Sequence, residues 1–414
     1  MIQLMYLIKY SSQYKIKRMK SNQHLLEMNK GTGPDLVCFS HLRWDFVYQR
    51  PQHLMSRLAK RFRTFFIEEP VFHNASDTYK IRLTNENVWI VTPQLSQSSQ
   101  KKATLLSRQK QIISLLFLHK KINEFVFWYY TPMALKITSH LNPQMVIYDC
   151  MDELSAFKFA PAELKIMEAE LFSKAQVVFT GGQSLYEAKK NAHHNIYPFP
   201  SSIDKVHFSQ GRKKLVEPAD QKDIPQLRFG FYGVIDERFN IQMIKEIAEK
   251  RPEWQLVLIG PVVKINPDDL PKCSNIHYLG SKSYNELPFY LSGWDIAMIP
   301  FEKNESTKYI SPTKTPEYLA AGKPVISTSI TDVVSPYGDK KLVYIADDAD
   351  TFIAAAEKEL AKKPAEIKRW LKTVDTFLEN VSWDYTTWQM MDKIQDGLLA
   401  NATGTETNKL KSVA

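Results

Sequence analysis

The sequence predicts an α/β protein with two domains, each built on a parallel β-sheet covered by helices on both faces. Its 414 residues are too many for one ordinary hydrophobic core. Short apolar, β-branched runs alternate with segments of helical periodicity along most of the chain. A polar stretch without apolar period, residues 209–226, separates two such series. We therefore expect two α/β domains joined by a linker.

The first domain is expected over residues 31–208. A buried strand at 35–40 is followed by leucines at helical spacing and by a second strand at 64–68, which together form a β-α-β unit. Strands separated by helices in this way predict a parallel sheet. The later strands of this domain are expected at 88–91, 125–129, 145–149 and 176–180.

The second domain is expected over residues 227–381. Its strands are predicted at 227–233, 254–260, 276–280, 294–301, 325–328 and 342–346. A helix at 382–400 follows this domain. The small and polar residues 401–414 are expected to be disordered.

Residues 1–30 carry several lysines and arginines but a single acid, Glu27. Their apolar part, residues 1–8, precedes the charges, whereas a secretory signal places positive charge first. No signal peptide is therefore expected. The segment is either a disordered basic extension or follows an upstream start that is not used, since Met19 and Met28 lie just before the first strand. A membrane anchor is the remaining alternative.

A net charge of +9 and a pI of about 9.1 predict attraction to an anionic partner. The sequence shows no nucleic-acid-binding module, so a phosphorylated substrate or an acidic membrane is favoured over nucleic acid. Residues 101–116 mix basic and apolar side chains at helical spacing. Such a helix either packs on the core or lies on an anionic membrane surface.

The three cysteines, Cys38, Cys150 and Cys273, are odd in number and far apart. This pattern argues against a disulfide framework and against a thiolate metal site. No window approaches the roughly 18 to 20 apolar residues that a spanning helix needs. We expect a cytoplasmic protein, with peripheral contact to the inner face of the plasma membrane as an open possibility.

The most informative stretch runs from Ser311 to Thr328 and predicts a loop, a short helix with proline at its first position, and a buried strand. A strand at 294–301 precedes it, so the loop follows the carboxyl end of a sheet strand, where open α/β sheets bind ligands. Lys314 and a helix N-terminus favour phosphate, while Glu317 in the first turn can accept hydrogen bonds from ribose hydroxyls. The stretch therefore predicts a nucleoside diphosphate site.

The run from Pro312 to Val325 resembles the donor motif of GT-B glycosyltransferases of family 4 and its relatives. Residues 278–280 and 294–296 precede it at the usual spacing for that family. Within the group, residues 44–53 together with 148–153 resemble bacterial cell-surface polysaccharide transferases of the teichuronic-acid-biosynthesis type. The resemblance extends in order over roughly residues 35 to 400.

This resemblance implies two Rossmann-like domains facing across a cleft, with the final helix crossing back to the first domain. It places a nucleotide-diphosphate sugar mainly on the C-terminal domain and a glycan or lipid-linked acceptor mainly on the N-terminal one. The residues it assigns to donor binding are Gly233, Arg238, Pro312, Thr313, Lys314, Thr315 and Glu317. Its candidate catalytic residues are Arg238, Lys314 and Asp152, and those on the acceptor side are His41, Asp45, Arg50 and Asp149.

The family's design requires no metal or other cofactor and implies retention of the anomeric configuration. Asp149 and Asp152 are three residues apart, unlike the Asp-x-Asp of metal-dependent transferases. Two features depart from the family. Tyr309 stands eight residues before Glu317, where members often carry a second Glu, and the aromatic and basic segment 41–53 replaces a Gly-rich loop.

Simpler roles remain open for several of these residues. An acid such as Glu317 is favourable near any helix N-terminus, and Lys314 could be a solvated loop lysine. Arg238 could form an ordinary ion pair with the neighbouring Asp236, and Asp152 could cap a helix.

The sequence therefore predicts a glycosyltransferase, with two alternatives: a catalytically silent nucleotide-binding scaffold of a polysaccharide assembly complex, and a sugar-nucleotide epimerase. It identifies neither the sugar, nor the base, nor the acceptor.

Overall fold

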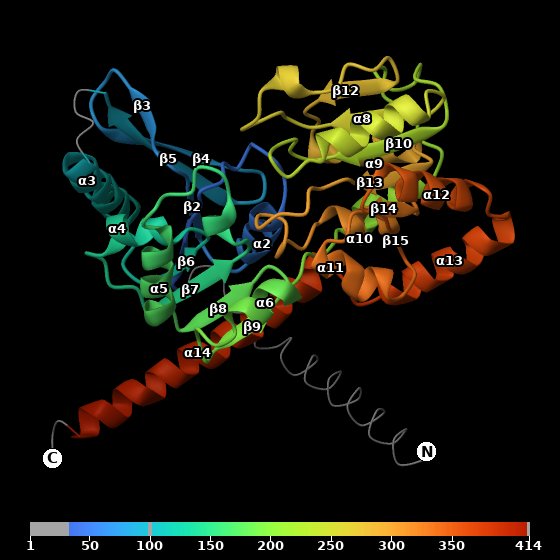
Figure 1. Cartoon of the computed structure of the whole chain (residues 1–414). Helices are drawn as coiled ribbons and strands as arrows, with labels where there is room; N and C mark the ends of the chain where they lie inside the picture. Colours follow the sequence, from blue (N-terminus) through green and yellow to red (C-terminus); the bar gives the residue numbers. More distant parts are fainter. Residues whose placement is uncertain (1–32, 98–101, 412–414) are drawn as a thin grey trace, which may run out of the picture.

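The computed structural model describes residues 33–97 and 102–411, which form two α/β halves side by side (Figure 1). The basic extension expected at residues 1–30 lies outside the described residues. No helix within the described ranges is long and apolar enough to cross a membrane.

The first half is built on a sheet that has nine strands within the described residues, in the order β3-β5-β2-β1-β6-β7-β8-β9, with β4 paired to β5. All pairs are parallel except β4 with β5. The strands are β1 (Asp35–Phe39), β2 (Thr64–Ile67), β3 (Val71–His73), β4 (Thr78–Leu83), β5 (Val88–Ser96), β6 (Phe125–Tyr129), β7 (Met145–Cys150), β8 (Val177–Thr180) and β9 (Ile196–Pro198).

The second half has a fully parallel sheet of six strands within the described ranges, in the order β12-β11-β10-β13-β14-β15. Numbered from its own first strand, this is the 3-2-1-4-5-6 order of a Rossmann fold. Its strands are β10 (Arg228–Tyr232), β11 (Gln255–Ile259), β12 (Ile276–Gly280), β13 (Ile296–Ile299), β14 (Val325–Ser327) and β15 (Tyr344–Ile345).

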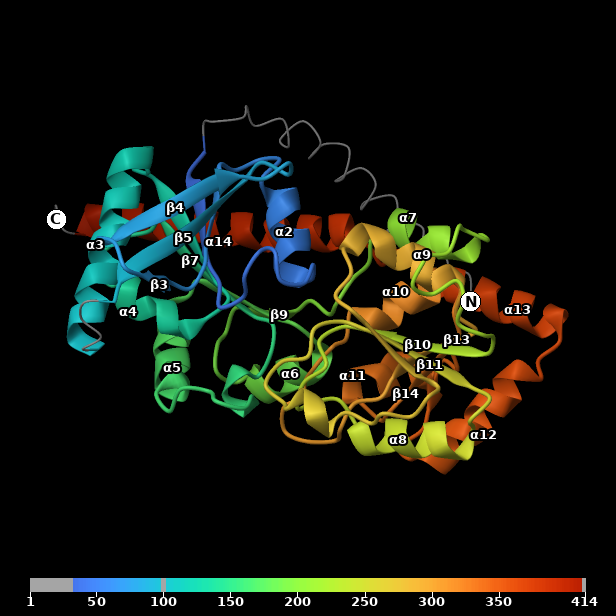
Figure 2. The ribbon, with the colours of Figure 1, turned by 90° about the horizontal axis from the view of Figure 1, so that it is seen from above.

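Helices connect the strands and cover the sheet faces (Figures 1 and 2). In the first half they are α2 (Arg50–Leu58), α3 (Lys102–Lys120), α4 (Leu135–Thr138), α5 (Leu164–Lys174) and α6 (Gln183–Lys189). Then follow α7 (Lys205–Phe208), α8 (Ile241–Lys250), α9 (Leu287–Ser292), α10 (Lys314–Ala320), α11 (Thr331–Val333), α12 (Ala349–Leu360), α13 (Pro364–Phe377) and α14 (Trp383–Lys411).

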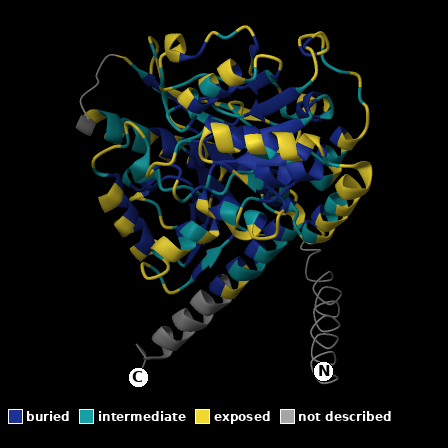
Figure 3. Cartoon of the chain, turned by 45° about the vertical axis from the view of Figure 1, so that its right-hand side comes forward, coloured by how far each residue is buried: buried dark blue, intermediate teal, exposed yellow. Residues whose placement is uncertain are grey.

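The central strands of both sheets are buried on both faces, as helix-covered parallel sheets require (Figure 3). Trp128 and Phe127 on β6 point to opposite faces of the first sheet and are each at most 1% exposed. Phe231 on β10 is likewise inaccessible. The predicted fold class is confirmed. The prediction succeeded because strands that are buried on both faces are apolar along their whole length.

Three strands were not expected from the sequence: β3, β4 and β9. They are short or lie near the sheet edge, and β4 alternates exposed polar residues with half-buried ones. Its antiparallel pairing follows from the short turn at Thr84, whose backbone carbonyl accepts from Asn87 N–H and whose own N–H donates to Val88 O.

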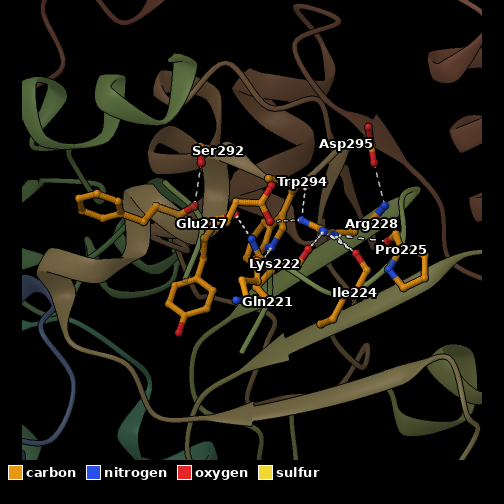
Figure 4. A network of polar contacts seen from close by, with 12 residues as sticks. Glu217, Gln221, Lys222, Ile224, Pro225, Arg228, Ser292, Trp294 and Asp295 are labelled. Carbon is orange, nitrogen blue, oxygen red and sulfur yellow. Dashed lines mark hydrogen bonds and ion pairs between the residues drawn. The ribbon is translucent and has the colours of Figure 1, made fainter. Parts of the chain in front are cut away.

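Residues 209–226, predicted to be a linker, pack closely against the second half. Figure 4 shows the contacts around Arg228, whose guanidinium donates to the carbonyl of Ile224 and is paired with Glu217. Buried Gln221 accepts from the indole of Trp294 at 2.9 Å. The polar composition of this segment therefore satisfies buried groups of the second half, which composition alone could not distinguish from a solvated linker.

The last helix, α14, packs against α2 and β8 of the first half and runs below β8 and β9 in Figure 1. This confirms the predicted crossover. The helix reaches Lys411, so most of the tail expected to be disordered at 401–414 is helical. No proline follows Pro364, so nothing in the sequence interrupts the backbone hydrogen bonds of this helix.

Candidate functional site

A cleft of about 510 Å³ lies between the two halves. Its N-terminal wall consists of residues 44–49, which join β1 to α2, and Glu86. Its C-terminal wall consists of the segments that follow β10, β11 and β12, and the start of α10. The carboxyl ends of β10 and β13 meet here, at the point where the strand order reverses, which is the usual ligand position in such sheets.

Two glycines allow the backbone to approach closely at this point. Gly233 and Gly260 end β10 and β11 with φ of +140° and +144°, a region that other residues rarely adopt. A Cβ on Gly260 would lie 1.8 Å from the carbonyl oxygen of Gly233, and one on Gly233 would lie 2.3 Å from Cε of Lys314. The absence of a side chain at Gly233 therefore leaves room for Lys314, and its absence at Gly260 lets the ends of β10 and β11 approach each other.

Glu317 lies in the first turn of α10 and is 3% exposed. The hydroxyl of Tyr232 donates to its Oε2 at 2.5 Å. The backbone N–H of Tyr232 also donates to the hydroxyl of Tyr318 at 3.0 Å, so the last residue of β10 holds α10 by two bonds. Within the described residues no group donates to Oε1, which is left for a ligand in the cleft.

Burial raises the pKa of Glu317 to about 7, against the smaller opposing effects of the Tyr232 hydrogen bond and the charge of Lys314. Burial and then repulsion from Arg238 lower the pKa of Lys314 to about 8. The Lys314 ammonium lies 5.6 Å and 5.5 Å from the ring centroids of Phe231 and Phe301. Burial therefore disfavours the charged form of both groups.

Arg238 lies at the junction of the cleft with a second cavity of about 90 Å³. Its Nε and Nη2 donate to the carboxylate of Asp236 at 2.7 to 3.2 Å. Asp152, from the N-terminal half, lines the same second cavity. Burial raises the pKa of Asp152 to about 6, while nearby Arg238 and Arg50 act in the opposite direction. Groups of both halves thus converge at this junction.

The structure separates the acceptor-side candidates. Asp45 is exposed, lines the cleft and pairs with Arg82. Asp149 is fully buried and bound by Arg50 at 2.8 to 3.1 Å, so its contacts are internal.

Arg50 also donates to the carbonyl of Phe199 at 2.6 Å while it lines the second cavity. Burial lowers the pKa of His41 to about 4, and neither cavity includes that residue in its lining.

The remaining donor-motif residues lie around Lys314. Pro312 and Thr313 line the second cavity, whereas Thr315 is buried with no partner for its hydroxyl among the described residues. Tyr309, the residue in place of a second Glu, packs against the core of the N-terminal half.

Sequence reasoning did not find Tyr232, Gly260 and Tyr284. Glycine directly after an apolar run marks the end of both β10 and β11, so this signal could have identified Gly260 as it did Gly233. The pairing of Tyr232 with Glu317 spans 85 residues and has no local signature. Tyr284 lines the cleft and stacks on His207 at 4.3 Å, a contact that only the fold creates.

The described part of the chain contains no cluster of three or more His, Cys, Asp or Glu side chains arranged to hold a metal. The expectation of a metal-independent reaction stays a prediction.

Residues 228–362 match the family model described as glycosyl transferases group 1. The chain is 26% identical over 260 residues to the putative teichuronic acid biosynthesis glycosyltransferase TuaH of Bacillus subtilis (strain 168). This match covers 58% of the chain and 64% of TuaH, less than two thirds of that relative. Residues 228–362 of the chain are therefore similar to the group 1 glycosyltransferases. The resemblance inferred from the donor motif is thereby confirmed.

Solved structures agree on the GT-B architecture. Sucrose-phosphate synthase of Thermosynechococcus elongatus superimposes with a TM-score of 0.66 at 14% identity, covering 89% of this chain and all of that chain. The E. coli trehalose-6-phosphate structure bound with UDP-2-fluoro glucose superimposes with a TM-score of 0.61 at 12% identity. The match covers 88% of this chain and 99% of that chain. The structure of Anabaena HepE in complex with UDP and glucose superimposes with a TM-score of 0.60 at 12% sequence identity. The match covers 87% of this chain and 99% of HepE. At these identities the likeness establishes the GT-B fold.

The raised pKa of Glu317 gives the first testable prediction. The folded protein holds this proton to a pH near 7, whereas an unperturbed Glu releases it near 4.5. The stability from this group is therefore present below about pH 4.5 and lost as the pH rises to about 7. Glu317→Gln does not titrate. Across that window the wild type should therefore lose about 3 kcal/mol of unfolding free energy relative to the variant.

Thermal melts of both proteins from pH 4 to pH 8 measure this difference. Glu305→Gln is the matched control, since that side chain is 77% exposed. The control should follow the wild type at every pH. Parallel curves for Glu317→Gln and the wild type would contradict the assigned protonation.

Proposed function

We propose that the protein is a glycosyltransferase that moves a sugar from a nucleotide-diphosphate sugar to a cell-surface polysaccharide or lipid-linked glycan. The observation that carries this proposal is the buried side chain of Glu317, which lines the cleft with Lys314 at the strand-order reversal and keeps Oε1 without a hydrogen bond from the described residues. A carboxylate there suits the two hydroxyls of a ribose. The neighbouring cations suit the diphosphate.

In this proposal the C-terminal half binds the donor. Glu317 accepts from the ribose hydroxyls, and Lys314 and Arg238 contact the diphosphate from the floor and the side of the cleft. Cleavage of the sugar–phosphate bond increases the negative charge on the leaving nucleoside diphosphate. Fixed cations in a closed cleft stabilise that charge more in the transition state than in the ground state. No metal is needed for this step, and the family resemblance implies retention.

The N-terminal half would hold the acceptor. Its cleft wall, residues 44–49, carries the exposed ring of Phe46 and the carboxylate of Asp45, which suit the apolar faces and the hydroxyls of a sugar. Asp152 faces the two donor cations from this half and is a candidate to contact the reacting hydroxyl. TuaH is named for teichuronic acid biosynthesis, which supports a surface glycan as acceptor.

Substitution of the donor residues tests the proposal. Glu317→Ala and Lys314→Ala should each weaken nucleoside diphosphate binding about tenfold to a hundredfold, because each removes a hydrogen bond to a charged group. Lys314→Ala should also lower turnover further, since charge develops beside it in the transition state. A thermal-shift titration with nucleoside diphosphates and their sugars measures binding, and release of nucleoside diphosphate measures turnover.

Glu305→Ala and Lys308→Ala are matched controls, because this exposed ion pair lies in the loop that leads to the donor motif. Unchanged affinity in Glu317→Ala would refute its role. Nucleotide binding without turnover for any acceptor would indicate the scaffold, and donor isomerisation without acceptor would indicate an epimerase. Loss of turnover in EDTA would refute metal independence.

We also propose that α3 contacts an anionic membrane, where lipid-linked acceptors reside. One face of α3 is buried through Ile112, Ile113 and Leu116, while Leu115 and Leu118 are 44% and 72% exposed. Exposed leucines on a helix that ends in lysine fit the boundary between headgroups and acyl chains. The net charge of +9 supports the attraction.

Liposome flotation tests this surface. The wild type should float with vesicles that contain anionic lipid at low salt, and Leu115→Ser with Leu118→Ser should reduce the floated fraction severalfold. Leu360→Ser is the control, since Leu360 is 37% exposed on α12 of the other half. Absence of flotation by the wild type at low salt would contradict the proposal.

A further inference from the structure

A segment of the N-terminal half reaches across to the arginine of the donor site. Residues 152–160 follow β7, and their backbone at Lys158 donates to Oε1 of Glu237 at 3.3 Å. The ammonium of Lys158 donates to the carbonyl of Lys264 at 3.5 Å. Glu237 and Lys264 both belong to the C-terminal half, so this segment connects the two halves beside Arg238.

Phe157 is the centre of this contact. The guanidinium carbon of Arg238 lies 5.2 Å from the centroid of its ring, and the ammonium of Lys264 lies 5.1 Å from the same centroid. Both distances are within the range of cation–π attraction. One aromatic ring of the N-terminal half therefore contacts two cations of the C-terminal half.

These contacts limit the freedom of Arg238. Its Nε and Nη2 donate to the carboxylate of Asp236. The ring of Phe157 lies against the guanidinium, and the ring centroid of Phe301 lies 5.9 Å from the guanidinium carbon. Its Nη1 has no hydrogen-bond partner among the described residues. Because Arg238 lines both the cleft and the second cavity, that nitrogen is available at the junction where the diphosphate of the proposed donor would lie.

We propose that Phe157 is a positioning residue for Arg238, so that recognition of the donor's diphosphate requires a side chain from the acceptor half. This inference rests on the proposed function and extends it: the donor site is complete only when the two halves are in contact. A free arginine side chain loses considerable conformational freedom when it binds a ligand. Contact with Phe157 and Asp236 already restricts the Arg238 side chain in the free protein, so less conformational entropy is lost when the diphosphate binds.

The second phosphate distinguishes positioning from a merely structural role. Arg238 at the cavity junction serves the diphosphate, whereas Glu317 and Tyr232 hold the nucleoside end. Loss of Phe157 should therefore weaken nucleoside diphosphate binding and leave the monophosphate nearly unaffected. A general distortion of the cleft would weaken both.

The experiment compares Phe157→Leu, which keeps an apolar side chain without an aromatic face, with Phe157→Tyr, which keeps the ring. Affinities of UDP, GDP, ADP and dTDP and of their monophosphates are measured by thermal shift and calorimetry on the full chain. Phe157→Leu should reduce the affinity ratio of diphosphate to monophosphate about fivefold to tenfold, and Phe157→Tyr should restore it. Phe159→Ala is the matched control, since Phe159 is 78% exposed on the same segment, and it should leave the ratio unchanged.

An unchanged ratio in Phe157→Leu, with normal diphosphate binding by the wild type, would overturn the role of Phe157 and leave the proposed function intact. An equal loss for both nucleotides, or a failure of Phe157→Tyr to restore the ratio, would also overturn it. If the wild type bound none of the nucleoside diphosphates, the proposed function and this inference would fail together.

Discussion

The burial of Glu317 and Lys314 at the carboxyl ends of β10 and β13 is the constraint on which the rest of the site depends. Each group loses hydration, and among the described residues each has fewer hydrogen-bond partners than an internal ion pair would supply. Such groups lower the stability of the empty protein and favour a ligand that provides the missing contacts. The surrounding fold holds them there: Tyr232 fixes Glu317, and the absence of a side chain at Gly233 makes room for Lys314.

The two halves share this site rather than merely enclosing it. Phe157 contacts Arg238 from the acceptor half, and Ser201 donates to the backbone carbonyl of Ser311 at 2.5 Å, next to the donor motif. Asp332 of α11 accepts from the backbone N–H of Ser184 at the start of α6, whose own cap position is a glycine. Contacts of this kind tie the geometry of the donor site to the relative position of the two halves.

Much of the fold was predictable, because fully buried strands such as β1, β6 and β10 produce unbroken apolar runs. The exceptions are physical. Edge strands such as β4 carry no such run, and the polar segment before β10 looks like a linker because its side chains satisfy buried groups elsewhere. The donor motif drew attention to Lys314 and Glu317, and both line the cleft; their role in donor binding stays a prediction. The ion pair between Asp149 and Arg50 could not be predicted, because the two residues are 99 positions apart and no local sequence pattern connects them.

A crystal structure of the protein with a bound nucleoside diphosphate tests the central claim most directly. We expect the ribose hydroxyls at Oε1 of Glu317 and the diphosphate between Lys314 and Nη1 of Arg238, with Tyr232 still bonded to Oε2. A nucleotide bound elsewhere, or one whose ribose lies away from Glu317 while its phosphates contact neither cation, would contradict it.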